Sequence, residues 1–516
     1  MSSKVISTAI IGIEPRLIEV EIDSSQGLHS FQIVGLADTA VKEAKERVSS
    51  AIKNIGATPP QRTNQRVIVN LAPADLPKNG SAYDLPIAIA YLLSSGQLAS
   101  AEALENKIFV GELSLDGKLR PINGALLIAE FAKRNHYKTI FLPKDNAPEA
   151  ALITDIEIIP VENLIDLCDH LQKNKIINPQ PKTEIEDFQT EDITALDFGF
   201  IIGQEHAKRA MEIAAAGGHN ILMLGPPGSG KSMLAQSFAS ILPPSEKEET
   251  LEITKIFSLA GLLDKTKPIV ASRPFRKPHH TASTVSLTGG GTNLRPGEIT
   301  LAHRGVLFLD EMPEFSRSVL EALRQPLENG RITVSRAIGT VEYPARFILI
   351  GAMNPCPCGY LSDPVKQCAC SPSQITKYSK KISGPLMDRI DIHLEVPPVK
   401  SDKFLDESGE PQSHIARARV INARKKQKER FSNSSIFTNA EMTNQQIKKF
   451  CSLPNETLEL LKNAAKKLQL SARSFFKIIK IGQTIADLDN SKTIKPQHIA
   501  EALQYRPKEN LTQYQR

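Results

Sequence analysis

Short apolar runs, separated by polar and glycine-rich segments, mark the regular elements along the chain. In residues 1–172 these patterns predict strands and helices together, which indicates an α+β domain. The predicted strands lie at 67–71 and 108–110, and the predicted helices at 84–94 and 125–133. The following residues, 173–192, are polar and contain two prolines, so we predict a linker there.

The middle of the chain, residues 193–398, contains continuous apolar runs and helical patterns. Apolar runs without polar alternation are typical of strands that are buried on both faces of a parallel sheet. We therefore predict an α/β core with a parallel sheet. Residues 399–435 predict a linker with a basic helix at 415–431. Residues 436–516 have apolar residues at helical spacing and predict a helical C-terminal domain.

Composition narrows the environment and the partners of the protein. The 516 residues are 41% hydrophobic, which suits two to four globular domains. No apolar run approaches the length of a membrane span, and the first ten residues lack the pattern of a secretion signal. We therefore expect a cytoplasmic protein with no membrane partner. The net charge of +6 permits nucleic acid as a partner without demonstrating it.

A phosphate-binding loop follows the apolar run 221–224, and a predicted helix, 232–242, follows the loop. The sequence fits G-x-x-x-x-G-K-[ST], in which backbone N–H groups and a helix N-terminus surround phosphate oxygens. Lys231 is expected to reach the β- and γ-phosphates of ATP, and the Ser232 hydroxyl to hold Mg²⁺. The loop consists of Gly225, Pro226, Pro227, Gly228, Ser229, Gly230, Lys231 and Ser232.

Two further apolar runs end in polar residues that suit ATP hydrolysis. Asp310 and Glu311 follow the run 306–309. A buried strand that ends in two carboxylates can place Asp310 near Mg²⁺ and Glu311 near the attacking water. Asn354 ends the next apolar run and should lie beside these acids, where it can hydrogen-bond the γ-phosphate or the water. A strand-capping role is the alternative for Asn354.

Four segments outside these ATP motifs carry a family resemblance. They are 274–283 (PFRKPHHTAS), 297–305 (GEITLAHRG), 383–391 (SGPLMDRID) and 470–473 (LSAR). Together with the ATP motifs they resemble AAA+ ATPases, and more closely the magnesium-chelatase-like AAA+ proteins of the ComM/YifB type, over nearly the whole chain. The resemblance implies an N-terminal Lon-protease-like domain of the ChlI type, an AAA+ core and a C-terminal helical lid.

The same resemblance implies roles for two arginines. Arg389 matches an arginine finger that acts in trans on the ATP of a neighbouring subunit, a device that contributes about 10³–10⁵ in rate in other NTPases. Arg473 matches the second sensor arginine, on the helical lid that closes over ATP. Because an arginine finger requires an oligomer, the resemblance implies a homo-oligomeric ring, a hexamer. Surface salt bridges are the alternative for either arginine taken alone.

Within the Lon-like domain, residues 78–85 match the position of a nucleophile loop and contain Ser81. The catalytic lysine of Lon proteases corresponds here to Leu126. Because a Ser–Lys dyad needs the amine as its base, Ser81 has no evident activator. We therefore interpret the domain as a non-proteolytic scaffold for ring assembly or DNA guidance, with an active protease as the alternative.

Two basic features are candidates for DNA contact. The insertion 255–301 contains Arg276 and Lys277, and the segment around Arg336 predicts a β-hairpin. In related AAA+ proteins such as the MCM helicases, the equivalent insert and hairpin point into the ring pore, which makes these cations candidates for phosphate contact. The alternative is that they form subunit interfaces. We interpret the basic helix at 416–431 as a solvated helix face.

Four of the six cysteines form two C-x-C pairs: Cys356, Cys358, Cys368 and Cys370. Four thiolates suit a closed, tetrahedral, structural Zn²⁺ site with no open position for catalysis. This spacing is weaker evidence than C-x-x-C pairs, and the family resemblance as a whole does not imply zinc. Reduced cysteines without a metal are the alternative.

The function that these features imply together is an ATP-driven ring motor that acts on single-stranded or branched DNA. Resemblance to ComM-type proteins implies branch migration during the recombination of incoming DNA in natural transformation. ATP hydrolysis is predicted from the residues themselves, whereas DNA as the substrate follows mainly from the resemblance. The alternatives are a metal-chelatase motor subunit that remodels a partner protein, an ATP-dependent protease and a nucleotide-switched scaffold.

Overall fold

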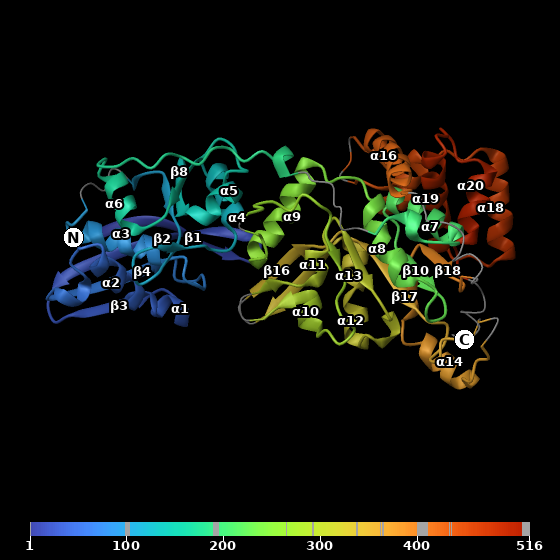
Figure 1. The fold of residues 1–516 in the computed structure, drawn as a ribbon, viewed down its shortest axis with the longest axis horizontal. Coiled ribbons are helices and arrows are strands. Elements are labelled where there is room, and N and C mark those ends of the chain that lie inside the picture. Colours follow the sequence, from blue (N-terminus) through green and yellow to red (C-terminus); the bar gives the residue numbers. More distant parts are fainter. Residues whose placement is uncertain are drawn as a thin grey trace.

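The protein has the α/β fold that the sequence predicts, and the molecule is elongated. The computed structural model describes residues 2–98, 104–188, 196–264, 266–291, 294–336, 339–361, 363, 366–399, 411–432, 434 and 436–507. Figure 1 shows the N-terminal domain at one end, a parallel sheet with its helices in the middle, and a group of C-terminal helices at the other end.

The N-terminal domain contains two larger sheets and the two-stranded pair β6-β7, and it confirms its predicted strands and helices. The first sheet has the order β1-β2-β4-β3, and the second, which is parallel, has the order β5-β8-β9. In β2 every second residue is buried, including Ile18, Val20 and Ile22, because one face of the sheet covers the core. The strands are β1 (Ser2–Ile11), β2 (Glu14–Gln26), β3 (Ser30–Val34), β4 (Gln65–Ala72), β5 (Lys107–Phe109), β6 (Glu112–Leu113), β7 (Leu119–Arg120), β8 (Thr139–Pro143) and β9 (Glu157–Val161).

Helices of this domain cover the two sheets. They are α1 (Thr39–Lys42), α2 (Ala44–Asn54), α3 (Asp84–Ser94), α4 (Ala125–Arg134), α5 (Ala147–Ala150) and α6 (Leu164–Leu171), with the 3₁₀ turns η1 (Pro60–Arg62) and η3 (Lys144–Asn146). The segment predicted as a linker continues along this domain: the Gln180 N–H donates to the Ile158 carbonyl at 2.8 Å, and Ile185 is buried beside Leu126. Up to residue 188 the segment therefore packs on the N-terminal domain and does not form a free linker. Residues 189–192 lie outside the described residues.

The central domain is built on a five-stranded sheet in which every neighbouring pair is parallel. The order is β11-β14-β17-β10-β18. The strands β14 and β17 are buried throughout, as their continuous apolar runs predict. The sheet consists of β10 (Ile221–Leu224), β11 (Phe275–Arg276), β14 (Val306–Leu309), β17 (Ile348–Met353) and β18 (Ile392–Glu395).

Helices and two small hairpins surround this sheet. The predicted hairpin around Arg336 is confirmed in its strands, β15 (Arg331–Arg336) and β16 (Gly339–Pro344), and a second pair is β12 (Gly289–Gly290) with β13 (Arg295–Pro296). The helices are α7 (Glu205–Gly217), α8 (Lys231–Ile241), α9 (Lys247–Ala260), α10 (Thr284–Thr288), α11 (Glu298–Leu301), α12 (Arg317–Ala322), α13 (Arg324–Asn329), α14 (Pro372–Ser379) and α15 (Gly384–Met387), with η4 (Glu186–Phe188), η5 (Phe198–Phe200) and η6 (Met312–Glu314).

The C-terminal helices share one hydrophobic core with the sheet. The basic helix is α16, and its cations bond to the rest of the protein: Arg424 donates to the Ala215 carbonyl at 2.9 Å, and Arg430 pairs with Asp487. This helix therefore packs against its neighbours in addition to facing solvent. The helices are α16 (Ser413–Arg430), α17 (Asn444–Phe450), α18 (Asn455–Lys467), α19 (Ala472–Leu488) and α20 (Pro496–Gln504), with η8 (Asn439–Glu441).

The N-terminal domain contacts the central domain at two places, visible in Figure 1 where α4 faces α9 and the β1–β2 turn approaches β16. Lys255 of α9 forms an ion pair with Glu130 of α4 at 2.6 Å. The turn residue Gly12 lies directly against Val341 of β16, where an added Cβ would clash. Its neighbours Ile11 and Ile13 pack on the same hydrophobic cluster as the hairpin. The two domains are therefore in direct side-chain contact.

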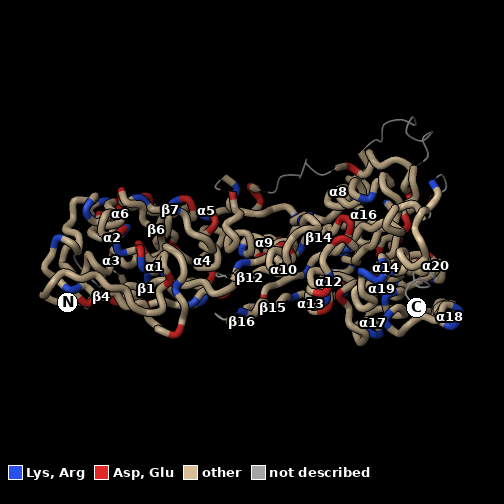
Figure 2. The backbone as a smooth tube through the Cα atoms, turned by 90° about the horizontal axis from the view of Figure 1, so that it is seen from below, with Lys and Arg blue, Asp and Glu red and all other residues tan. Residues whose placement is uncertain are grey.

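Charges of both signs are distributed along the molecule. In Figure 2 the Lys and Arg positions alternate with Asp and Glu positions over the length of the tube, and in that view they form no single basic face. A DNA-binding surface on this chain would therefore consist of local clusters. No helix in the described part of the chain combines the length and the apolar character that a membrane crossing requires.

Candidate ATP site and its counterpart at the other end of the sheet

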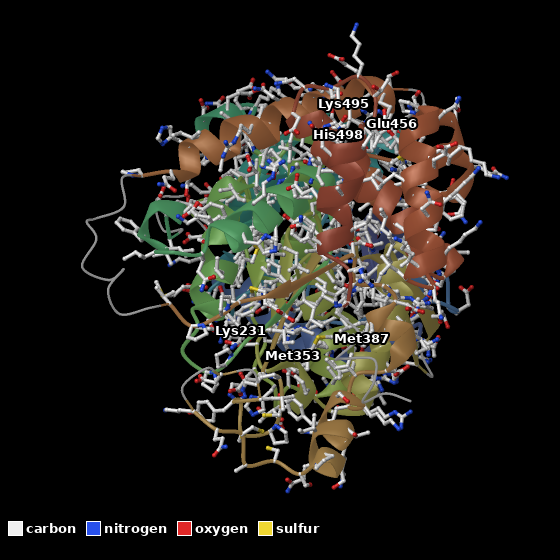
Figure 3. The ribbon with its side chains drawn as sticks, turned by 90° about the vertical axis from the view of Figure 1, so that its right-hand side faces the viewer. Lys231, Met353, Met387, Glu456, Lys495 and His498 are labelled. Atoms are coloured by element: carbon white, nitrogen blue, oxygen red, sulfur yellow. The ribbon has the colours of Figure 1, made fainter. Side chains whose placement is uncertain are left out.

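The predicted nucleotide residues meet at the carboxyl end of the parallel sheet. The phosphate loop follows β10, Asp310 follows β14 and Asn354 follows β17, and β17 lies between the other two strands. Parallel strands end at the same edge, where α/β proteins commonly bind ligands. Figure 3 shows Lys231 close to Met353, the last residue of β17. The expected position of Asn354 beside Asp310 and Glu311 follows directly from this strand order.

Hydrogen bonds connect these residues to one another. The Lys231 ammonium donates to the carbonyls of Gly225 and Pro226 at 2.7 and 2.8 Å, and it lies 3.3 Å from the Asn354 side-chain oxygen. Burial lowers the pKa of Lys231. The Ser232 hydroxyl donates to Asp310 at 2.8 Å. A hydroxyl beside a carboxylate is the hard oxygen donor set that Mg²⁺ prefers, so these two residues fit that ion.

The glycines of the loop have the conformation that phosphate binding needs. Gly228 and Gly230 have φ of +78° and +89°, in the left-handed region that glycine adopts without strain. An added Cβ at either position would meet no atom within 4 Å, so the space above the loop is open. Backbone N–H groups can therefore line a concave surface in front of α8.

Glu311 extends into solvent in front of the sheet. It is a non-glycine residue with φ of +50°, a conformation that costs of order 1–3 kcal/mol and that is concentrated at functional sites. Its side chain is 60% exposed and lies 3.7 Å from His280. The carboxylate is thus accessible to a water molecule beside the phosphate loop.

Arg276 and Lys277, predicted as DNA contacts, lie at the end of the edge strand β11 and directly after it, beside the candidate ATP site. The Lys277 ammonium pairs with Asp310 at 3.1 Å and lies over the Phe308 ring. Arg276 makes two hydrogen bonds to Glu298, at 2.6 and 2.8 Å. These partners support a role in the ATP site and its packing, and contact with DNA remains a prediction for both residues.

A cavity beside the phosphate loop was missed by the sequence reasoning. It has a volume of about 380 Å³ and is lined by the residues before α7, the start of the loop and the chain after β18. The Gln204 amide closes one side by donating to the Pro397 carbonyl at 2.8 Å. Its apolar walls and its position suit the base of the nucleotide. The glycine and glutamine before α7, Gly203 and Gln204, were the available sequence signal.

A second cavity, of about 610 Å³, lies at the amino end of the same sheet. Asn220 and Gly305 precede β10 and β14, Asp391 precedes β18, and Ile348 begins β17; all four line it. The strands β10, β14, β17 and β18 have four to six residues each, so the cavity and the phosphate loop lie at opposite ends of these strands. In Figure 3 Lys231 and Met387 are labelled to the left and the right of Met353.

Both predicted ATP-sensing arginines line this second cavity. Arg389 and Arg473 converge on Glu328, the latter at 3.4 Å, and Arg473 also lies 3.9 Å from Asp388. No phosphate-loop residue lines the cavity. The helix α19 packs against α7 and α16 and begins at the amino end of the sheet, where Arg473 joins Arg389. A role for Arg473 at a bound ATP stays a prediction.

Comparisons with known proteins agree with this architecture. The family model described as magnesium chelatase, subunit ChlI, matches residues 197–404. Two more, described as subunit ChlI of Mg-chelatase and magnesium chelatase, subunit ChlI C-terminal, match residues 20–146 and 410–506. The competence protein ComM of Haemophilus influenzae is 42% identical over 517 residues, which cover 99% of this chain and 98% of ComM. The chain belongs to the ComM/YifB family of magnesium-chelatase-like AAA+ proteins.

Other relatives place the chain within this family. The uncharacterized protein YifB of Escherichia coli is 41% identical over 510 residues, or 98% of this chain and 97% of YifB. The magnesium-chelatase 38 kDa subunit of Cereibacter sphaeroides is 26% identical over 174 residues, which are only 31% of this chain and 52% of that subunit. Membership of the ComM/YifB family supports an ATPase that uses ATP and Mg²⁺.

Two other predicted features of the family member can be examined in the structure. Arg336 is exposed on β15, and its guanidinium lies over Gly290, where an added Cβ would be 3.1 Å from it. The hairpin tip, residues 337 and 338, lies outside the described residues, and DNA contact by Arg336 remains a prediction.

In the N-terminal domain Ser81 donates to Glu112, and Leu126 is fully buried in an apolar cluster. That the domain is non-proteolytic stays a prediction.

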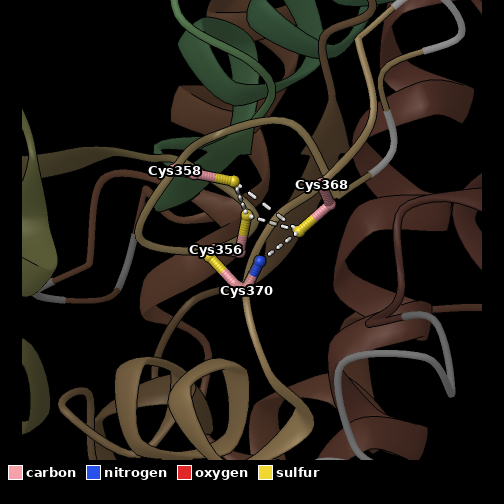
Figure 4. Close-up of side chains that lie close together, drawn as sticks. All are labelled: Cys356, Cys358, Cys368 and Cys370. Atoms are coloured by element: carbon pink, nitrogen blue, oxygen red, sulfur yellow. Dashed lines mark hydrogen bonds between the residues drawn. The ribbon is translucent and has the colours of Figure 1, made fainter.

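The four predicted zinc ligands come together in one cluster, shown in Figure 4. All four sulfur atoms lie within 4.8 Å of one another. The shortest separation is 3.3 Å, between Cys356 and Cys358, and Cys368 lies 3.6 Å from each of them. None of the six cysteines of the chain forms a disulfide. The arrangement suits a metal ion, and its identification as zinc is argued below.

Proposed function

We propose that this protein is an ATP-driven ring motor that acts on single-stranded or branched DNA, with branch migration of incoming DNA during transformation as its task. The observation that carries the motor is the division of ATP-site residues between the two ends of one sheet. Lys231, Ser232 and Asp310 form one half, and Arg389 lies at the other end. A complete site then needs two subunits, which supports a ring.

Each residue at the carboxyl end has a distinct task in this proposal. Bound Mg²⁺ would draw charge from the phosphates. Ser232 and Asp310 hold the ion, and Lys231 neutralises the β- and γ-phosphates. Glu311 orients the attacking water and accepts its proton. Asn354, 3.3 Å from the Lys231 ammonium, holds that cation and reaches the γ-phosphate.

Arg389 and Arg473 complete the site from the neighbouring subunit. Both guanidiniums are paired with the Glu328 carboxylate in the single chain. A γ-phosphate carries more negative charge than a carboxylate, and Arg binds both in the same two-pronged geometry. Phosphate of the neighbouring subunit therefore replaces Glu328 as their partner when the ring forms. Six-fold closure and the in-trans role of Arg389 both belong to this proposal.

DNA as the substrate is supported by the similarity to a competence protein over 99% of the chain. The test is ATP turnover by the full-length protein, alone and with single-stranded, duplex or four-way-junction DNA. We expect stimulation by DNA that is greatest with the junction, followed by strand movement in a branch-migration assay. Turnover that is equal with and without every DNA would overturn DNA as the substrate.

The second candidate is a protein-remodelling motor such as a metal-chelatase subunit. It is favoured by the match of the central domain to the magnesium chelatase ChlI model. The alignment with the 38 kDa chelatase subunit covers only 31% of the chain, which makes the DNA motor the better supported proposal. A DNA-independent ATPase that co-purifies with a stable protein partner would favour the second candidate.

A further inference from the structure

The cysteine cluster has the geometry of a metal site. A tetrahedral Zn²⁺ with Zn–S bonds of about 2.3 Å holds its sulfur atoms about 3.8 Å apart. The sulfur–sulfur distances among Cys356, Cys358 and Cys368, from 3.3 to 3.6 Å, are close to that edge and far from the roughly 2 Å of a disulfide. Four sulfurs leave no open position, so the site suits structural zinc.

The loop that carries the cysteines begins at the ATP site. Asn354, which lies beside the Lys231 ammonium, is two residues before Cys356. Gly359 has φ of +89°, and an added Cβ there would be 2.5 Å from the Pro227 ring and 3.8 Å from the Asn354 side chain. The turn that follows Cys358 therefore rests directly on the phosphate loop and on the residue that faces Lys231.

The other end of the loop is fixed to the core. Ser371, next to Cys370, caps α14 and forms a capping box with Gln374. From this helix Tyr378 packs into the hydrophobic cluster under the sheet. The described residues between Asn354 and α14 include no helix or strand, and the turns Gly359–Cys356 and Asp363–Tyr360 supply the backbone hydrogen bonds. Such a segment gains most of its order from a metal that joins its two ends.

We propose that the four cysteines bind one Zn²⁺, and that this ion holds the Gly359 turn against Pro227 and Asn354, so that nucleotide affinity depends on zinc. The proposal rests on nucleotide binding at the phosphate loop and adds a second metal with a purely positional role. Cys356, Cys358, Cys368 and Cys370 bind the ion, and Gly359 transmits its effect. Mg²⁺ has no preference for thiolates, so the two metal sites are chemically distinct.

The first measurement is the metal content and nucleotide affinity of the full-length protein. We expect about one zinc per chain, since four cysteines complete one tetrahedron. A zinc chelator, followed by restored Mg²⁺, should weaken binding of a fluorescent ATP analogue about tenfold. Added Zn²⁺ should restore the affinity. Protein without zinc, or an affinity that is unchanged after zinc removal, would overturn the proposal.

Two substitutions separate metal binding from its consequence. Cys368→Ser should lose both zinc and affinity. Gly359→Ala retains all four ligands and the zinc but should lose affinity about tenfold, because its Cβ meets Pro227 in a strained conformation. Gly359→Ala also keeps the test valid if Cys368→Ser fails to fold. If the Gly359→Ala protein retains zinc and binds nucleotide as tightly as wild type, the Gly359 turn does not transmit the effect of zinc.

The controls are Cys168→Ser, a cysteine in the N-terminal domain, and Gly56→Ala, a glycine with φ of +82° and no atom within 4 Å of the added Cβ. Both should retain zinc and nucleotide affinity. Loss of zinc or of nucleotide affinity in either control would count against the proposed site. Such a loss would mean that the effect does not depend on the four clustered cysteines or on Gly359. Wild-type protein that holds zinc but no nucleotide would overturn the ATP site itself. Nucleotide binding that persists without zinc would overturn only the proposal that zinc holds the Gly359 turn against the phosphate loop.

Discussion

The two ends of the central sheet are built in different ways. At the carboxyl end Lys231 already donates to the Gly225 carbonyl of the phosphate loop, and Ser232 donates to Asp310. At the amino end two long side chains share Glu328: Arg389 from the turn after α15, and Arg473 from α19. A strand of four residues spans about 13 Å, so the two sets cannot serve one ATP within a chain. This difference supports the proposal that the first set binds nucleotide and that the second reaches a nucleotide on another molecule.

The largest expected effect is at the carboxyl end. Lys231→Ala should abolish nucleotide binding and, with it, turnover, because it removes the cation that faces the β- and γ-phosphates. Equilibrium binding of a fluorescent ATP analogue and steady-state hydrolysis measure the two losses. Lys466→Ala, at an exposed lysine of α18, is the matched control and should behave as wild type. Wild-type hydrolysis by Lys231→Ala would reject the phosphate-loop assignment.

Arg389→Ala tests whether the amino end acts on another subunit. Turnover should fall about 10³-fold, whereas nucleotide binding stays unchanged, because the residue is remote from the phosphate loop of its own chain. Mixing Arg389→Ala with Lys231→Ala subunits should restore part of the turnover, since each supplies what the other lacks. Weaker nucleotide binding by Arg389→Ala alone, or no recovery of turnover on mixing, would contradict the proposal that Arg389 acts on the ATP of another subunit. Arg16→Ala is the control at an exposed arginine.

Glu311→Gln separates binding from hydrolysis at the carboxyl end. The amide has the same shape but cannot accept a proton, so turnover should fall about 10²–10³-fold with nucleotide affinity retained. Single-turnover hydrolysis with pre-bound ATP measures the step directly. Glu314→Gln, at a nearby acid that pairs with Lys381, is the control. If Glu311→Gln turns over normally, another residue orients the water.

Arg473→Ala should have the smallest effect. Its side chain is 48% exposed and shares Glu328 with Arg389, so we expect about a tenfold loss of turnover. The mixing assay with Lys231→Ala decides which subunit it serves: recovery would place its action on the neighbour. A loss of nucleotide affinity in the isolated subunit would instead return Arg473 to a lid over its own ATP.

The parts that the sequence predicted well are those that local pattern determines. Apolar runs located β10, β14 and β17, and the end of each run carried the loop, Asp310 or Asn354. Because parallel strands end at one edge, neighbours in the sheet brought these residues together. The predicted helix at 84–94 coincides with α3, since a helical period is also a local signal.

What the sequence could not predict are contacts between distant segments. Which end of the sheet receives Arg473 depends on how α19 packs against α7, and no local pattern specifies that packing. The pairing of Lys277 with Asp310 arises because β11 lies beside β14. The segment 173–188 looked like a linker by composition, yet Ile185 is buried against the N-terminal domain. The cavity beside the phosphate loop was missed because its walls come from four separate parts of the chain.

The contact of Gly12 with Val341 gives the N-terminal domain a mechanical consequence. Val341 belongs to β16, one strand of the hairpin that carries Arg336. If the hairpin swings during an ATP cycle, it must either separate from the β1–β2 turn or pull that turn with it. In the proposed motor, the domain that has Leu126 in place of a catalytic lysine would then limit how far the hairpin travels.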